Sequence, residues 1–107
     1  MSESAESGPI FMLNALWFKP DGGEQAYRKY LRAAQGVSAK YGGKKLEAYV
    51  PDLEMIGNFD ADLLFFVEWP SWEVFQSFIN DEEFLAVRHL REQAIVKSLL
   101  IRCHKVG

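Results

Sequence analysis

The chain is poor in cysteine, in proline and in long apolar runs, and it has no excess of basic residues. Its 107 residues include one cysteine, Cys103, and four prolines. A lone cysteine cannot form an intrachain disulfide, so we expect a reducing compartment, the cytoplasm. The most apolar window, residues 63–67, is far too short to cross a bilayer. A formal net charge of −3 without a basic stripe argues against nucleic acid as a partner.

The composition predicts one domain behind a short tail. Residues 1–8 are small and acidic, lack the pattern of a signal peptide, and are expected to form a flexible tail. Residues 9–107 are expected to form a single domain, because a chain of about 100 residues can bury roughly 60–70% of its unfolded surface. Aromatic residues make up 14% of the chain. Some of these rings are expected to need cover from a partner subunit.

Apolar periodicity predicts four strands and three helices. The strands are expected over residues 10–18, 44–57 (broken at Pro51), 63–69 and 98–106. The first helix follows Asp21, whose spacing to Glu24 resembles a capping box, and ends at the Gly42-Gly43 pair. Ser71 and Asp81 are expected to cap two further helices.

The order of these elements predicts an α+β fold. With the last two helices taken together, the order is β-α-β-β-α-β, typical of the ferredoxin-like fold, a four-stranded antiparallel sheet with its helices on one face. Residues 63–69 are apolar on both sides, which places them at the centre of the sheet. The face without helices then needs cover, so we expect a homodimer of two facing sheets.

Four segments carry a resemblance to a known family. They are Ala26-Tyr-Arg-Lys-Tyr-Leu, Lys40-Tyr-Gly-Gly, Val67-Glu-Trp-Pro-Ser-Trp-Glu and Glu83-Phe-Leu-Ala-Val-Arg-His-Leu-Arg-Glu. Across roughly residues 10–106 the chain resembles the domain-of-unknown-function 1330 family, part of the dimeric α/β-barrel superfamily. The resemblance implies a ferredoxin-like protomer and a dimer, and no general activity.

The chain departs from the family pattern at two positions. Ile56 stands where members typically have an acidic residue, and Leu63 stands where they usually have an arginine. If those polar residues form a family site, half of it is missing here. Members of the wider superfamily include cofactor-free monooxygenases, isomerases and haem proteins, so the fold alone does not select an activity.

Strand alternation suggests one candidate ligand site. Asn14, Glu68, Arg102 and His104 are expected on the face without helices, lining a cavity between the sheet and the partner subunit. They could bind a small polar or carboxylate-bearing molecule, with Arg102 as anchor and His104 or Glu68 as proton carrier. The simpler interpretation is that Glu68 and Arg102 form an ion pair, within the chain or across the interface.

Other candidates have simpler structural explanations. Arg88, His89 and Arg91 could bind an anion, although a charged helical face is normally solvated. A pocket for a planar substrate could use aromatic residues that would otherwise pack in the core or the interface: Trp17, Phe18, Trp69 and Trp72.

No metal or cofactor is expected. Cys103 and His104 are neighbours on a strand, so they point apart and cannot chelate one ion. The sequence has no haem-attachment motif, nucleophile elbow or phosphate-binding loop.

Three functions remain open from the sequence. The first is a small-molecule binding or regulatory dimer, and the second is a cofactor-free enzyme, similar to monooxygenases or isomerases, acting on a small aromatic or carbonyl substrate. The third is a structural interaction module. An enzyme needs a closed pocket on which Glu68, Arg102 or His104 converge.

Overall fold

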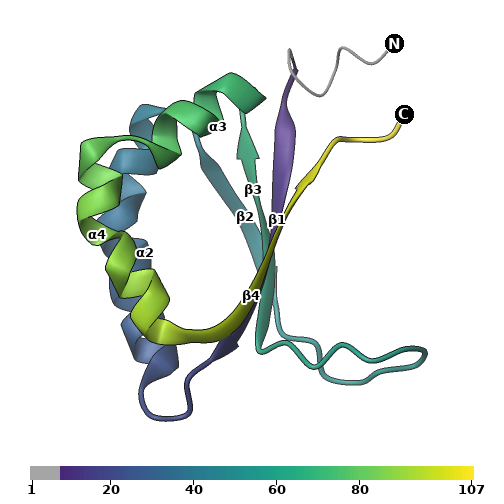
Figure 1. The fold of residues 1–107 in the computed structure, drawn as a ribbon. Coiled ribbons are helices and arrows are strands. Elements are labelled where there is room, and N and C mark those ends of the chain that lie inside the picture. The colour runs from purple at the N-terminus through teal and green to yellow at the C-terminus, as the bar shows by residue number, and fades with distance from the viewer. Residues whose placement is uncertain (1–7) are drawn as a thin grey trace.

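The computed structural model describes residues 8–107, and the tail expected over residues 1–8 therefore lies almost wholly outside the described residues. The elements follow in the order β1 (Ile10–Phe18), α2 (Gly23–Lys40), β2 (Lys44–Tyr49), β3 (Leu63–Trp69), α3 (Trp72–Ile79), α4 (Glu82–Ala94) and β4 (Ile95–Cys103). Figure 1 shows the helices together on one side of the sheet.

The sheet confirms the ferredoxin-like prediction. Its four strands pair antiparallel in the order β2-β3-β1-β4. β3 lies inside the sheet, as its apolar sequence predicted, and β2 forms one edge. We call the side covered by helices the helix face and the other side the open face.

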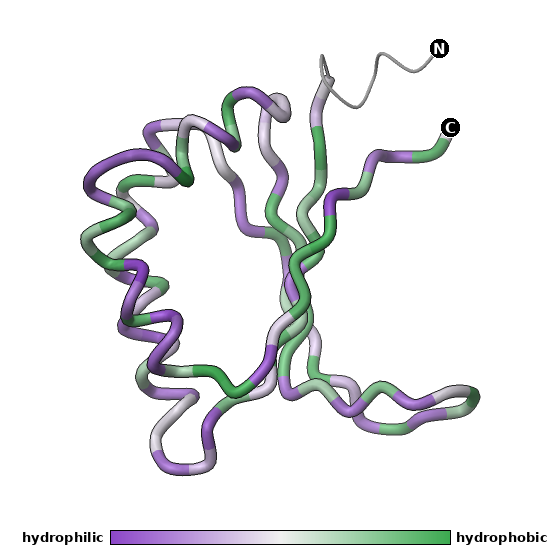
Figure 2. Tube along the Cα trace, in the orientation of Figure 1, coloured by the Kyte–Doolittle hydropathy of each residue, from purple (hydrophilic) through white to green (hydrophobic). Residues whose placement is uncertain are grey.

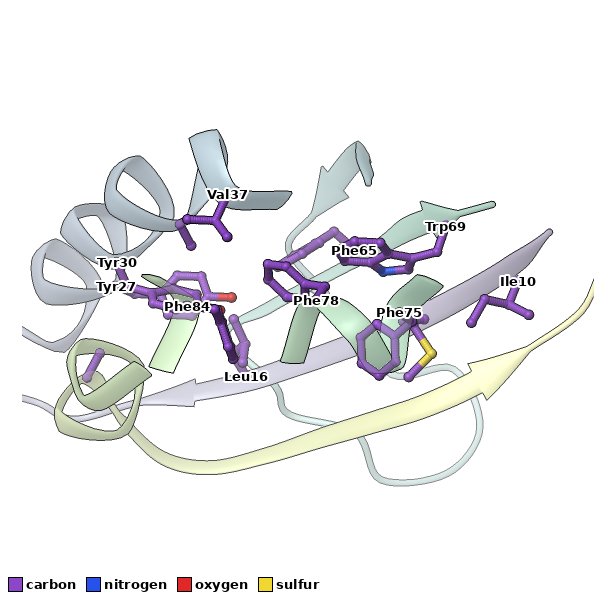
Figure 3. Packing of buried hydrophobic residues seen from close by; sticks show 13 residues of the cluster. Ile10, Leu16, Tyr27, Tyr30, Val37, Phe65, Trp69, Phe75, Phe78 and Phe84 are labelled. Carbon is purple, nitrogen blue, oxygen red and sulfur yellow. The ribbon is translucent and has the colours of Figure 1, made fainter. Parts of the chain in front are cut away.

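Aromatic side chains fill the space between the helix face and the helices. Phe65 and Trp69 from β3 meet Phe75 and Phe78 from α3, and Tyr27 from α2 lies at the other end of this cluster (Figure 3). The Trp69 and Phe78 rings are 4.7 Å apart between centroids. Burying each such side chain stabilises the fold by about 1.5–3 kcal/mol, so this cluster fixes the helices on the sheet.

Two of the three expected helix caps are confirmed. The Ser71 side chain accepts a hydrogen bond from the Val74 backbone, and the Asp81 side chain accepts one from Glu83. The capping box at Asp21 and Glu24 is wrong, because Gly22 occupies the cap position with a left-handed φ of 79° and no side-chain bond. No helix within residues 8–107 is long and apolar enough to cross a membrane.

Two strand boundaries also differ from the prediction. The chain leaves the sheet after Tyr49, so residues 53–56 form no strand. The last strand covers Ile95–Cys103 rather than 98–106. It follows α4 directly, and it ends where Cys103 meets Phe11 near the start of β1, because no partner strand continues beyond that point.

The chain between β2 and β3 forms a projecting loop. We call residues 50–60 the arm; it extends from the open-face side of the sheet (Figure 1) and carries both apolar and polar residues to its tip (Figure 2). The indole of Trp17 donates a hydrogen bond of 2.9 Å to the Asp60 carboxylate. The ring of Phe59 packs edge-on against the same Trp17. These contacts fix the base of the arm on β1.

Two glycine substitutions test the packing at the sheet edge. A Cβ at residue 43 would lie 2.7 Å from the Trp69 ring, which is enclosed by α3, whereas a Cβ at residue 36 would meet nothing within 4 Å. Gly43→Ala should therefore lower the free energy of unfolding by about 1–3 kcal/mol. Gly36→Ala, inside α2, should raise it by up to about 1 kcal/mol. Urea unfolding of both variants measures this difference, and equal effects would contradict the packing described.

Candidate functional site

The four predicted site residues do not share one face of the sheet. Asn14 pairs with Phe65 and Arg102 pairs with Met12; both partners are core residues, so Asn14 and Arg102 lie on the helix face. Glu68 pairs with Phe11 on the open face. The expected grouping on the open face is therefore wrong for Asn14 and Arg102.

Each of these side chains has its own surroundings. Asn14 is 8% exposed and donates a 3.2 Å hydrogen bond to the Met12 carbonyl. The Arg102 guanidinium stacks 4.6 Å from the centroid of the Trp72 ring on α3. Because Glu68 lies on the other side of the sheet, Arg102 and Glu68 of one protomer cannot form an ion pair. His104 follows the end of β4 and is exposed. A ligand role for any of the four stays a prediction.

The face assignment was wrong because the helices cover the sheet unevenly. At the outer strand β4 the helix face is thinly covered, and Leu100 on that face is 50% exposed. A charged side chain such as Arg102 is therefore tolerated there. Three other residues of β4 face the open side, because they pair with β1 residues of that face: Leu99, Ile101 and Cys103. The assumption that the more apolar side of a strand faces the helices therefore fails at an edge strand.

The aromatic and basic candidates are also dispersed. Trp17 holds the base of the arm on the open face, whereas Trp69 is in the core. The two rings therefore cannot line one pocket. On α4, Arg88 forms an ion pair with Glu92, and His89 is exposed. Arg91 differs, because its Nη2 atom is buried and has no hydrogen-bond partner within the described residues.

A groove lies on the helix face between α2 and the β2 edge. Its volume is about 960 Å³, within the range of small-molecule sites. Phe18, Tyr27 and Leu31 supply apolar walls on one side, and Ala48 and Leu63 supply them on the other. Five charged side chains, three basic and two acidic, stand around it: Lys19, Glu24, Arg28, Lys45 and Asp62.

A β-bulge places Lys45 in this groove. Lys45 pairs with Val67 and Ala48 with Phe65, and the register shifts by one residue between them. In a regular strand, residues 45 and 48 would point to opposite faces. The extra residue brings both to the helix face, as bulges do when they redirect side chains. Lys44, the neighbour of Lys45, pairs with Glu68 and lies on the open face.

The groove has a cation without a matching carboxylate. Asp62 accepts a 2.8 Å hydrogen bond from the Phe18 backbone, and Glu24 pairs with Arg28 at 2.9 Å. The ion pairs found within residues 8–107 do not include Lys45, whose ammonium lies 4.7 Å from the centroid of the Phe65 ring. The groove therefore offers apolar walls together with an available positive charge.

Tyr27 remains protonated where it borders the groove. Burial raises the pKa of its hydroxyl well above the ordinary 10.0, the nearby Tyr30 hydroxyl adds to this, and the Arg91 guanidinium opposes it. Burial likewise raises the pKa of Tyr30. At neutral pH the Tyr27 hydroxyl is thus a neutral hydrogen-bond donor and not a base.

Sequence reasoning missed the groove residues. Neither Tyr27 nor Lys45 was among the candidate site residues. The face of Lys45 depends on the bulge, which has no clear sequence signal. Within residues 8–107, no three histidine, cysteine, aspartate or glutamate side chains gather as a metal site.

Comparisons with known proteins agree with this fold. Residues 22–102 match the family described as a domain of unknown function, DUF1330. The chain belongs to this family. No curated protein matches it.

Solved structures share this fold. A protein of unknown function from Rhodopseudomonas palustris is 31% identical, with a TM-score of 0.87 over 95% of this chain and 85% of that one. A dabb family protein with a ferredoxin-like fold from Mesorhizobium loti is 19% identical (TM-score 0.67; 94% and 99% covered). A dimeric protein of unknown function with this fold from Bacteroides fragilis is 11% identical (TM-score 0.62; 89% and 94% covered).

Alkaline unfolding tests the protonation of Tyr27. Because the folded-state pKa is raised, the unfolded chain releases the Tyr27 proton above about pH 10 while the folded chain retains it. Stability present below pH 10 is therefore lost as the pH rises. Tyr27→Phe should reduce the slope of the free energy of unfolding against pH by up to about 1.4 kcal/mol per pH unit. Urea unfolding between pH 8 and about pH 11 measures it, and an unchanged slope would contradict a buried, neutral Tyr27.

Proposed function

We propose that this protein is a homodimer that binds one small organic anion per protomer. The dimer forms through the open face, whose side chains are mainly apolar although the protomer's own helices leave them uncovered. β1 contributes Phe11 and Leu13, β3 contributes Phe66, and β4 contributes Ile101, which is 44% exposed. Such a face is typical of a buried interface. The single cysteine supports a reducing compartment such as the cytoplasm.

A charge placed in the open face tests the dimer. Ile101→Glu would bury an unpaired carboxylate between the two sheets, and it should weaken the dimer at least about a hundredfold. Leu85→Glu is the matched control, because Leu85 on α4 has a similar exposure of 46% but lies on the helix side. Sedimentation velocity over a range of concentrations measures both variants. A wild-type chain that stays monomeric at micromolar concentration would refute the proposal.

The groove, and not a cavity between the sheets, is proposed to hold the ligand. The observation that carries this proposal is the Lys45 ammonium, held over Phe65 beside aromatic walls while both groove carboxylates have other partners. A carboxylate on a planar or aromatic body would pair with Lys45 and pack against Phe18 and Tyr27. Both carboxylates of the groove are engaged, Asp62 by the Phe18 backbone and Glu24 by Arg28, and the Tyr27 hydroxyl stays protonated, so we propose binding rather than catalysis.

Paired lysine variants test the groove. We expect benzoate to bind wild-type protein more tightly than benzamide, its neutral analogue, as measured by NMR titration of the α2 and β2 amides. Lys45→Ala should reduce benzoate affinity about tenfold, the usual loss of one charge-assisted hydrogen bond. Lys44→Ala, with the same loss of charge on the opposite face, should leave it unchanged. Equal affinity for benzoate and benzamide, or equal effects of the two variants, would contradict the proposal.

A further inference from the structure

We infer that the arm of each protomer packs against the C-terminal segment of its partner, residues 95–107, so that the two arms lie at opposite ends of the dimer. This inference rests on the proposed homodimer and specifies its symmetry. It assigns a role to the arm, which the groove does not explain.

The arm is held in place at its base and is apolar at its tip. Trp17 binds Asp60 and Phe59, as described above, and the Glu54 carboxylate accepts a 2.8 Å hydrogen bond from the Phe59 backbone. Beyond this base, Leu53 is 77% exposed, Met55 83% and Ile56 97%. A projecting apolar tip of this kind is typical of a contact surface. It projects on the same side as the open face, where the partner sheet is proposed to lie (Figure 1).

The arm and the C-terminal segment carry opposite charges. Residues 50–60 contain three acidic residues, Asp52, Glu54 and Asp60, and no basic one. Residues 95–107 contain no acidic residue, and two of their basic side chains lie over residues of the open face, Lys97 over Trp17 and Lys105 over Phe11. Arg102 lies on the helix face and takes no part in this match. The segment also exposes apolar side chains that suit the arm tip, since Val106 is 91% exposed. Each surface therefore complements the other in charge and in apolar character.

The arm of one protomer cannot contact the basic end of its own C-terminal segment. The base of its own arm packs on Trp17, beside the Lys97 end of β4, where the Lys97 ammonium is 4.5 Å from the Trp17 ring centroid. At 3.3 Å per residue, Cys103 lies roughly 20 Å further along the strand. Lys105 lies beyond that point, over Phe11 on the open face. The basic end of the segment is therefore available to a different arm.

Two arrangements of the facing sheets, with the two-fold axis parallel or perpendicular to the strands, differ in which charged groups they bring together. A two-fold axis parallel to the strands would place the two acidic arms side by side, and the two basic ends side by side, so like charges would repel at both places. An axis perpendicular to the strands places each arm beside the partner's basic end. Because every contact in an isologous interface occurs twice, the second arrangement pairs opposite charges at both ends of the dimer.

Cross-linking distinguishes these arrangements. In a Cys103→Ser background, Ile56→Cys and Val106→Cys together should give a covalent dimer with a short bis-maleimide, whereas Ile56→Cys alone should not. Gln35→Cys with Val106→Cys is the control that should stay uncross-linked, because Gln35 is exposed on α2. Cross-linking of Ile56→Cys alone, or no covalent dimer from the Ile56 and Val106 pair, would overturn the inference.

A charge swap gives a second, independent measurement. Asp52→Lys and Lys105→Glu should each weaken the dimer about two- to fivefold, and the double variant should recover most of the loss. Additive losses in the double variant would overturn the contact. These results are separable from the dimer itself: a monomeric wild type refutes the homodimer, whereas a stable dimer with additive losses refutes only the position of the arms.

Discussion

The structure depends on one constraint: three helices cover only one face of a sheet whose central strands are apolar on both. β3 alternates Phe65 and Trp69 toward the helices with Leu64 and Phe66 away from them, and β1 does the same. The aromatic cluster under α3 satisfies the first set within the protomer. The second set has no cover from the same chain, so the fold of one protomer already contains a reason to assemble. Both the proposed interface and the direction of the arm derive from this asymmetry.

The same asymmetry separates two kinds of site. On the helix face, the groove lies where α2 approaches the β2 edge of the sheet, and there the walls are aromatic and the available charge is positive. On the open face, charges occur mainly at the margins, where Lys44, Glu68 and Lys105 lie around apolar residues. A small ligand and a second protomer would therefore use opposite sides of one sheet. Binding on one side need not compete with assembly on the other.

The sequence predicted the architecture well because its signals are local and repeated. The apolar run of β3, the glycine pair after α2 and the caps at Ser71 and Asp81 each predict an element without knowledge of the rest. The faces of the candidate site residues were predicted less well, because one wrong choice of face reverses every side chain of a strand. For β4, the boundary came out three residues late and the more apolar side was assigned to the helices. At an edge strand both sides are partly exposed, so apolar content no longer identifies the helix face. Arg102 was placed on the wrong side for this reason.

The bulge in β2 has a consequence for how relatives of this protein can diverge. Because one extra residue between Lys45 and Ala48 lets both side chains point at the groove, a strand of the same length that paired regularly from Ala48 would put residue 46 opposite Val67 and turn residue 45 outward. The groove would lose the Lys45 ammonium although no lysine had been replaced. In this family, a change in strand pairing can alter ligand preference as effectively as a substitution. Alignments that score only residue identity would overlook it.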